Sequence, residues 1–520
     1  MAGQREALVR TYDEIRYPYV AHRQTDPVRL ATIARFHGIA APPVDTSRVL
    51  EIGCAVGGNL AALATTLPSA RFVGFDISEG QITQGRAALE AAGVGNVALV
   101  PLDIMDVGTT LGTFDYVIAH GVLSWISPDA QDELFALLAR SLSPNGIAYV
   151  SYNARPGWHE LSVVRDGMMF DVRGIEDPRE RVQRGRAYLD WLLQSMPDGG
   201  RYGQRFIEEV ALVQSLDDES LAHEYLGPYH MPIHFQKVMA RANHHGLAYL
   251  CDAEPALSAD HSVAPEAERA RLRSPDELVF AEQYYDFLTN RRFRRTLLCR
   301  RTQRISRTID AKLVDEMFIS SRGRPTHEPS VAEVRGNEPL TFGTAESDLS
   351  TASPLMKAAL LHLSSVAPRA ISFAELAAGV CARLGSSSLS DAELDELRSN
   401  VVHAFFSSVG VMNLRTHAPP CVAEPSEHPV ASAWTRYVAR EAERVPSLDL
   451  EMVRLDDVLR RIVPLLDGTR DQAALEAELD AMVTRGDVVM RTPDGRPGRP
   501  APGAMAGALK MLARSGLLVG

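Results

Sequence analysis

The chain of 520 residues is 45% hydrophobic and 23% charged. This length exceeds what one hydrophobic core usually serves, and the composition excludes collagen-like, coiled-coil and wholly disordered chains, so several packed domains are expected. The formal net charge of −12 has the wrong sign for binding nucleic acid or an anionic membrane through bulk electrostatics. We therefore expect neither a nucleic-acid partner nor a membrane partner.

The five cysteines lie far apart, at positions 54, 251, 299, 381 and 421. They form neither the close pairs of a zinc site nor the density of a disulfide scaffold, which favours a reducing compartment. The first residues are polar, and no apolar run approaches the roughly 18 residues that span a bilayer. The sequence therefore predicts a cytoplasmic chain without a leader or an anchor.

Between residues 48 and 153, short β-rich runs alternate with helical stretches, the pattern of a parallel sheet that helices cover on both faces. Ala and Leu recur at helical spacing between the runs, for example over residues 59–67 and 78–92. The expected strands are residues 48–52, 71–75, 97–100, 114–118 and 147–151. This pattern predicts an α/β domain with a Rossmann-like, doubly wound sheet.

A mainly helical block interrupts this rhythm after Tyr152. Two further strands are predicted at residues 247–251 and 296–299, with an amphipathic helix over 276–290 before the second of them. We therefore expect three successive parts: the first half of the sheet over residues 1–152, a helical insertion and possible dimerisation region over 153–231, and a segment that completes the sheet over 232–310.

Residues 311–353 are polar and rich in Gly, Pro, Ser and Glu, which is typical of a linker or long surface loop. Beyond them, three apolar stretches at helical spacing and a short strand predict a winged-helix-like domain over residues 354–425. A similar pattern predicts a second helical or winged-helix-like domain over residues 426–520, in which residues 492–503 form a loop. The C-terminal part is thus expected to be mainly helical.

The most informative segment is the β-rich run over residues 48–52, which contains Glu51 and leads into a turn with Gly53, Ala55 and Gly57. A strand, a glycine-rich turn and a helix in this order form a nucleotide site in doubly wound sheets. Asp76 ends the next expected strand, where a carboxylate accepts both ribose hydroxyls of an adenosine. These two elements together are more specific than a glycine turn alone.

The same turn discriminates between cofactors. A dinucleotide places pyrophosphate at the helix N-terminus, where the charge of Glu51 and the methyl group of Ala55 are both unfavourable. S-adenosyl-L-methionine carries no phosphate, and negative charge stabilises its sulfonium and ammonium groups. At the third strand end, Asp103 offers a carboxylate to an adenine amino group and Ile104 offers an apolar cover. The sequence therefore predicts S-adenosyl-L-methionine as cofactor, S-adenosyl-L-homocysteine as product, and no metal.

With these residues the chain resembles the class I S-adenosylmethionine-dependent methyltransferases. A narrower resemblance rests on the segments Tyr12 to Glu14, Thr25 to Pro27, His120 to Trp125, Tyr152 to Trp158, His223 to Leu226 and Arg291 to Cys299. They are similar to those of bacterial methyltransferases that carry a methyltransferase regulatory domain, a group containing rickettsial lysine methyltransferases of outer-membrane proteins. The resemblance implies a dimerisation region, a possible homodimer, and lysine as the acceptor in some members.

We expect cofactor contacts from the turn, the strand ends and the N-terminal segment. The predicted residues are Tyr12, Glu51, Gly53, Ala55, Gly57, Asn59, Asp76, Ile77, Gln81, Asp103, Ile104 and His120.

Methyl transfer from a sulfonium is an in-line displacement, so the acceptor must lie about 3 Å from the methyl carbon, away from water. A lysine acceptor is charged at pH 7, and removing its proton costs roughly 4.6 kcal/mol, which an apolar pocket lowers by desolvation. Tyr17, Trp125 and Trp158 are the predicted substrate-pocket residues. By base rate, however, aromatic residues near the N-terminus are more often packing residues.

The predicted catalytic residues are His120, Tyr152 and Asn153. His120 follows the fourth strand, where ligands of such sheets bind, and is a candidate for proton transfer. Alternatively, it caps the strand or contacts the cofactor. Tyr152 and Asn153 either line the acceptor pocket or end the fifth strand.

Two further clusters admit a structural explanation. The histidines at positions 223, 230, 234, 244 and 245 match no common metal-ligand spacing, so we predict no metal there. The arginines at positions 291, 292, 294, 295, 300, 301, 304 and 307 form either a solvated, ion-paired surface or a docking site for an acidic substrate segment.

The sequence thus predicts a methyltransferase that acts on lysine side chains of a protein, with the C-terminal domains presenting or gating the substrate. One alternative is the same chemistry on a small-molecule or natural-product acceptor. Another is a non-catalytic winged-helix scaffold.

Overall fold

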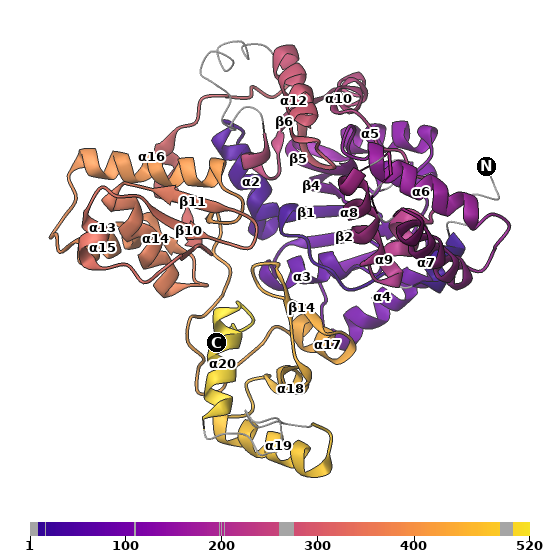
Figure 1. The fold of residues 1–520 in the computed structure, drawn as a ribbon. Coiled ribbons are helices and arrows are strands. Elements are labelled where there is room, and N and C mark those ends of the chain that lie inside the picture. The colour runs from indigo at the N-terminus through magenta and orange to yellow at the C-terminus, as the bar shows by residue number, and fades with distance from the viewer. Residues whose placement is uncertain are drawn as a thin grey trace.

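The computed structural model of the chain is drawn in Figure 1. It describes residues 9–15, 17–108, 111–196, 198, 200, 201, 203–258, 275–488 and 503–519. The loop predicted at residues 492–503 lies outside the described residues, apart from Gly503.

A seven-stranded sheet forms the centre of the N-terminal part (Figure 1). Its strands in spatial order are β3 (Val97–Pro101), β2 (Arg71–Asp76), β1 (Arg48–Ile52), β4 (Phe114–Ala119), β5 (Leu142–Asn153), β7 (Phe293–Arg300) and β6 (Leu247–Asp252). The first five run parallel, and β7 is antiparallel to both neighbours. The strand order reverses between β1 and β4, so a ligand crevice is expected at their carboxyl ends.

Helices cover both faces of this sheet, as the alternating pattern predicted. Leu60 and Ile82 belong to the core on one face, and Leu134 and Phe235 to the core on the other. The helices of the first face are α2 (Pro27–Phe36), α3 (Gly58–Thr66) and α4 (Glu79–Ala92), and those of the second are α5 (Pro128–Ser141), α10 (Phe235–His244) and α12 (Pro275–Thr289). The Rossmann-like fold class is confirmed.

The helical block between β5 and β6 has a hydrophobic core of its own. Met168, Leu189 and Val213 are fully buried in it, and Ile15 of the N-terminal segment packs among them. Its helices are α6 (His159–Asp171), α7 (Pro178–Ser195), α8 (Gly203–Gln214) and α9 (Asp218–Tyr225). The insertion is therefore a separate packed unit on the edge of the sheet domain.

Residues 311–353, predicted as a linker or long loop, are folded, and this prediction is wrong. Ile319 and Phe342 are fully buried, and the buried ammonium group of Lys357 donates to three backbone carbonyl groups of this segment. Turn residues between very short strands gave the segment its loop-like composition. Its elements are η6 (Ala311–Glu316), β8 (Phe318–Ser321), β9 (Arg324–Pro325), α13 (Val331–Arg335), β10 (Leu340–Gly343) and β11 (Asp348–Thr351).

The rest of the C-terminal part forms two mainly helical units, as expected. In the first, β8 lies between β12 (Ile371–Ser372) and β13 (Met412–Arg415). The helices of that unit are α14 (Pro354–Val366), α15 (Phe373–Leu384) and α16 (Asp391–Ser407). The second unit comprises α17 (Ala433–Glu441), β14 (Arg444–Pro446), β15 (Met452–Arg454), α18 (Asp457–Ile462), α19 (Gln472–Arg485) and α20 (Ala504–Arg514). The exact domain boundaries stay predictions.

The C-terminal units share one hydrophobic core with the first face of the sheet. The ring of Phe36 in α2 lies 5.5 Å from that of Phe406 in α16. Tyr19 packs edge-on against Trp434 of α17, with ring centres 5.2 Å apart. The N-terminal segment is therefore held between the sheet domain and the C-terminal units.

Candidate functional site

A cavity of about 390 Å³ lies at the carboxyl ends of β1, β2 and β4. Glu51 and Asp76 come from the first two strands, His120 follows the third, and the N-terminal segment adds Tyr12 and Tyr17. The structure thus brings together most of the predicted site residues. Those that line the cavity are Tyr12, Tyr17, Glu51, Gly53, Ala55, Asn59, Asp76, Ile77, Asp103, Ile104, His120 and Trp125.

The glycine-rich turn between β1 and α3 is close-packed. Gly53 and Gly57 have φ values of +69° and +73°, in the left-handed region that favours glycine. A Cβ at Gly53 would lie 2.6 Å from Cγ2 of Val122, and one at Gly57 would lie 2.9 Å from both methyl groups of Leu99. Both positions therefore require glycine for conformation and for space.

Glu51 is buried, and its two oxygens differ in their surroundings. Asn59 Nδ2 donates to Oε1 at 2.8 Å, whereas Oε2 is buried without a hydrogen-bond partner among the described residues. Asn59 also donates to Thr25 Oγ1 at 3.0 Å and accepts from the backbone N–H of His22 at 2.9 Å. Asn59 therefore fixes Glu51 and the N-terminal segment at once, and leaves one carboxylate oxygen for a ligand.

Asp76 at the end of β2 is held by backbone donors on both of its oxygens. The N–H of Ala55 donates to Oδ2 at 2.9 Å, and that of Ser78 donates to Oδ1 at 3.0 Å. Farther along the crevice, Asp103 Oδ1 accepts from the N–H of Met105 at 2.9 Å. These bonds fix both carboxylates at the cavity edge, where a ribose and an adenine of an adenosine would lie.

Burial disfavours the ionised form of Glu51 and Asp76 and so raises the pKa of both carboxyl groups. Burial raises the pKa of Glu51 to about 8; the Asn59 hydrogen bond lowers this pKa and Asp76 raises it. Burial also raises the pKa of Asp76. A cation placed at Oε2 of Glu51 would stabilise its ionised form, so the site complements a positively charged ligand.

His120 forms a wall of the cavity together with His22. The two rings stack with centres 3.8 Å apart, and Nδ1 of His120 lies 2.9 Å from the hydroxyl of Tyr149. Burial lowers the pKa of His22 to about 4, and burial, His22 and Arg295 lower the pKa of His120 well below its usual value. A neutral histidine with such a low pKa is a weak base, which disfavours the proton-acceptor role predicted for His120.

Aromatic side chains close the end of the cavity beside the histidines. Burial and nearby carboxylates raise the pKa of Tyr17 to about 12, so its hydroxyl stays neutral. The ring of Trp125 lies 4.9 Å from that of His230, and Tyr229 lines the cavity next to it. This end is therefore the apolar, aromatic-walled part of the site.

Tyr152 does not line the cavity, which corrects the catalytic role predicted for it. Its side chain is buried in the second core of the sheet, and its hydroxyl lies 3.0 Å from Thr296 Oγ1. Side chains alternate between the faces of a strand, and Tyr152 faces the α5 side.

Asn153 and Trp158 lie behind the aromatic end and not in the cavity. Asn153 Nδ2 lies 3.1 Å from Nε2 of His230, and the Trp158 ring lies 4.3 Å from that of His230. Both therefore support His230, which in turn contacts Trp125. This corrects the direct substrate contacts predicted for them.

Gln81 and Gly57 were predicted as cofactor contacts, but neither lines the cavity. The Gln81 side chain is buried, and its Nε2 donates to the backbone carbonyl of Tyr12 at 3.1 Å. Gly57 serves the turn by its conformation. Both residues thus shape the site, and their contact with the cofactor stays a prediction.

Among the residues of the cavity wall that the sequence interpretation missed are His22 and Tyr229. His22 follows the predicted aromatic segment and precedes Thr25, so the N-terminal motif offered a weak signal. Tyr229 lies beyond the helical insertion, and nothing in its spacing indicated that the chain returns to the cavity there.

The described residues offer neither a metal-binding group of side chains nor a membrane-spanning helix. No three His, Cys, Asp or Glu side chains of those residues are grouped so that they could hold a metal ion. In that same part of the chain, no helix is both long and apolar enough to cross a bilayer.

Three family models match segments of the chain. They are described as "Methyltransferase domain" over residues 49–146, "Predicted methyltransferase regulatory domain" over residues 217–300, and "PKMT, C-terminal winged helix domain" over residues 427–515. An uncharacterized protein of Rickettsia prowazekii (strain Madrid E) is 31% identical over 491 residues, which are 92% of this chain and 87% of that protein. A second one is 35% identical over 233 residues, 45% of this chain and 93% of that protein.

A solved structure is similar to the whole fold. PKMT2 from Rickettsia typhi in complex with AdoHcy superposes with a TM-score of 0.84 at 28% identity, covering 97% of this chain and 100% of that one. AdoHcy is S-adenosyl-L-homocysteine, the product expected from the sequence. The similarity therefore includes the insertion and the C-terminal units as well as the sheet.

The cavity fits the predicted donor. Oε2 of Glu51 lacks a partner among the described residues and suits the ammonium group of the methionine part. Asp76 suits the ribose hydroxyls, and Asp103 with Ile104 suits the adenine. With the donor in that orientation, its methyl group would lie toward the part of the cavity lined by His120 and Trp125.

We predict that the affinity for S-adenosyl-L-homocysteine rises with pH up to about 8. Glu51 is protonated below its pKa of about 8, and the ammonium of the ligand requires its ionised form. Binding then releases a proton, and the association constant increases by as much as about tenfold per pH unit below pH 8. Isothermal titration calorimetry between pH 5.5 and 8.5 measures this slope.

Glu51→Gln is the matched control, since it keeps the shape and removes the titration. It should bind more weakly at pH 8 and show a flat profile. A variant with the wild-type slope would show that another group titrates.

Proposed function

Because the chain belongs to the S-adenosylmethionine-dependent methyltransferases that carry a methyltransferase regulatory domain, we propose that it methylates lysine side chains of a protein substrate. The observation that carries the proposal is the similarity to PKMT2 of Rickettsia typhi over both whole chains. Further support comes from residues 427–515, which match the family model described as "PKMT, C-terminal winged helix domain".

Different residues of this chain position the methyl donor and the acceptor. When bound, S-adenosyl-L-methionine supplies an electrophilic methyl group on a sulfonium. Glu51 would hold the ammonium group of the donor and Asp76 its ribose, and the close-packed turn at Gly53 fixes the backbone between them. The aromatic end near Trp125 then orients the acceptor and excludes water.

The acceptor amine must lose its proton before it attacks. Removing a proton from lysine at pH 7 costs roughly 4.6 kcal/mol, and desolvation in an apolar pocket reduces this cost. Tyr17, Trp125 and Tyr229 provide such a wall, whereas the low pKa of His120 makes its ring a poor proton acceptor. We therefore propose that desolvation lowers the pKa of the amine, which passes its proton to water as it enters the pocket, and we assign His120 to holding the wall.

The proposal includes a homodimer and a cytoplasmic location. The helical insertion exposes apolar side chains, with Phe170 at 64%, Trp191 at 59% and Leu212 at 49%, which supports pairing through this unit. The five cysteines of the chain are free thiols, which supports a reducing compartment.

The acceptor class is tested by label transfer. The purified chain is incubated with methyl-labelled S-adenosyl-L-methionine and a bacterial lysate, and we predict that label enters protein and appears as methylated lysine after acid hydrolysis. Asp76→Ala, which removes the ribose contact, should lower incorporation at least tenfold at limiting donor. Label in small molecules would favour the alternative acceptor, and label in other amino acids would contradict lysine.

Replacing His120 separates desolvation from base catalysis. His120→Gln keeps a polar side chain beside Tyr149, so we predict less than a tenfold fall in the methylation rate at saturating donor. A general base contributes about 10²–10⁴-fold, and a loss of that size would restore the proton-transfer role of His120.

A further inference from the structure

Most arginines of the basic stretch between residues 291 and 307 have partners within the fold. The ion pairs are Arg291 with Asp252, Arg292 with Glu209, and Arg294 with Glu282 and Asp286. Those that donate to backbone carbonyl groups are Arg300 and Arg307. Those exposed to solvent are Arg301 and Arg304. Ion pairs and backbone hydrogen bonds therefore account for most of this stretch, but Arg291 and Arg294 are buried and do not form the solvated surface expected from the sequence.

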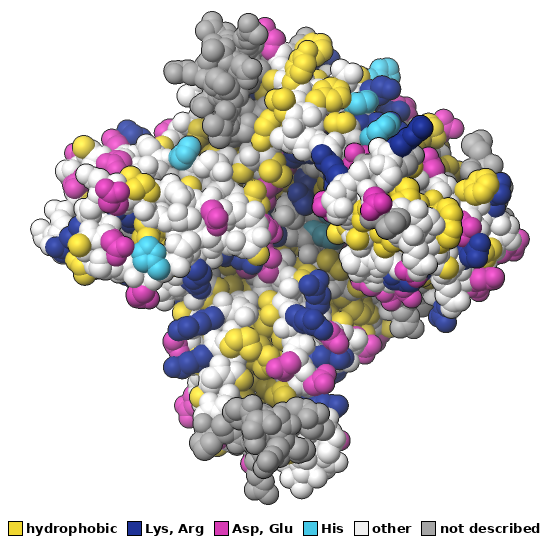
Figure 2. Space-filling view, in the orientation of Figure 1, with side chains coloured by type: hydrophobic (Ala, Val, Ile, Leu, Met, Phe, Trp, Pro, Cys, Tyr) yellow, Lys and Arg dark blue, Asp and Glu magenta, His cyan; other side chains and the backbone are white. Residues whose placement is uncertain are grey.

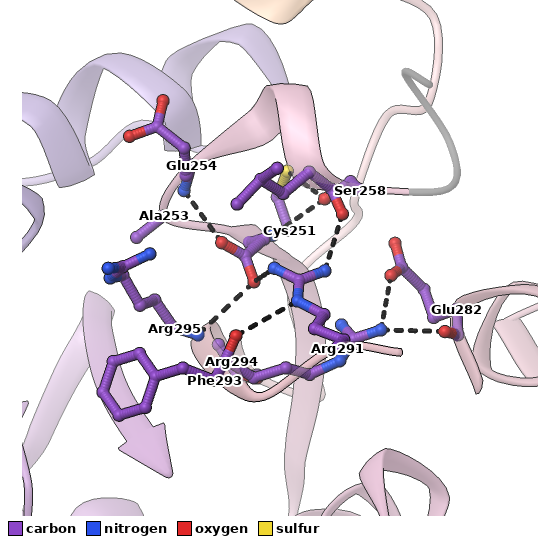
Figure 3. A network of polar contacts seen from close by, with 12 residues as sticks. Cys251, Ala253, Glu254, Ser258, Glu282, Arg291, Phe293, Arg294 and Arg295 are labelled. Carbon is purple, nitrogen blue, oxygen red and sulfur yellow. Dashed lines mark hydrogen bonds and ion pairs between the residues drawn. The ribbon is translucent and has the colours of Figure 1, made fainter. Parts of the chain in front are cut away.

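Arg295 departs from this pattern. Its Nε is buried and lacks a hydrogen-bond partner among the described residues, and no carboxylate of that part of the chain pairs with its guanidinium. In Figure 3 its side chain points away from Arg291, and the dashed line at Arg295 reaches only its backbone N–H, which donates to Asp252 Oδ2 at 3.4 Å. The guanidinium carbon lies 5.1 Å from the centre of the Phe293 ring. A partly buried cation without a counter-ion destabilises a fold, so a ligand is a natural reason for it.

Arg295 lies behind the wall that His22 and His120 form. In the sheet it pairs with Ser151 of β5, whose Oγ is 3.4 Å from Nδ1 of His120. The Phe293 ring, on which the guanidinium rests, lies 6.0 Å from the His120 ring. Arg295 is thus close to the histidines at this end of the cavity, although it is not itself one of the residues that line it.

We propose that Arg295 binds a carboxylate of the methyl acceptor, so that the substrate carries an acidic side chain close to the methylated amine. The inference rests on the proposed function, since it specifies the protein segment on which that activity acts. A guanidinium binds a carboxylate through two parallel N–H donors, which gives strength and orientation.

The surface of the molecule agrees with an approach from this side. Figure 2 shows a hollow between the sheet domain and the C-terminal units, with Lys or Arg and His side chains visible inside it. The chain as a whole carries a net charge of −12 and therefore repels an acidic segment over most of its surface. An unpaired arginine beside the cavity selects the carboxylate locally.

A peptide array tests this inference. Lysine-centred peptides with Glu, Gln, Lys or Ala at each flanking position are methylated with labelled donor by the wild type, Arg295→Gln and Arg304→Gln. We predict that the wild type and Arg304→Gln methylate peptides with Glu at one position at least tenfold better than those with Gln. Arg295→Gln should lose that preference and keep its affinity for S-adenosyl-L-homocysteine. An equal preference in Arg295→Gln, or none in the wild type, would overturn the inference.

A second measurement tests the role of Arg295 even if no peptide is methylated. The absence of methylation would refute the proposed function but not the binding of a carboxylate by Arg295. Glutarate is titrated into the protein with bound S-adenosyl-L-homocysteine at constant ionic strength, and the melting temperature is recorded. We predict a rise of about 1–2 °C for the wild type and Arg304→Gln, and none for Arg295→Gln. Without ligand, Arg295→Gln should melt no lower than the wild type, because it removes an uncompensated cation. A lower melting temperature, or the same glutarate shift in all three proteins, would identify a structural role instead.

Discussion

The amide of Asn59 is the contact on which the site depends. It donates to Glu51 and to Thr25, and it accepts from the backbone of His22. One side chain in the first turn of α3 therefore links a buried carboxylate of the sheet to the segment that closes the cavity. Because each buried polar group here has few partners, the loss of this amide would free both the carboxylate and the segment.

The closing segment also joins the domains. Arg23, one residue beyond His22, forms buried ion pairs with Glu254 of the sheet domain, and pairs with Glu346 and Glu451 of the two C-terminal units. Asp26 pairs with Arg415 of β13 at 3.0 Å. The C-terminal units are thus joined by ion pairs to residues that follow His22 of the cavity wall within a few positions. That they present or gate the substrate stays a prediction.

The sequence predicted well the elements that follow from hydrophobic periodicity and from the residues of the glycine-rich turn. Strands buried on both faces and the glycine turn led to the sheet, and Glu51 and Asp76 led to the cofactor. It failed where short strands are hidden among turn residues, as at Ile319 and Phe342, because no local period reveals them. It also misplaced Tyr152, since the face to which a strand residue points depends on packing that a single strand end does not encode.

Glu51 and Asp76 together complement a cationic, phosphate-free adenosine ligand. A crystal structure of this protein with S-adenosyl-L-homocysteine would show whether they bind one. We expect the ligand's ammonium group within hydrogen-bond distance of Oε2 of Glu51 and its ribose hydroxyls on Asp76. A ligand bound elsewhere, or one whose ammonium group avoids Glu51, would refute this assignment.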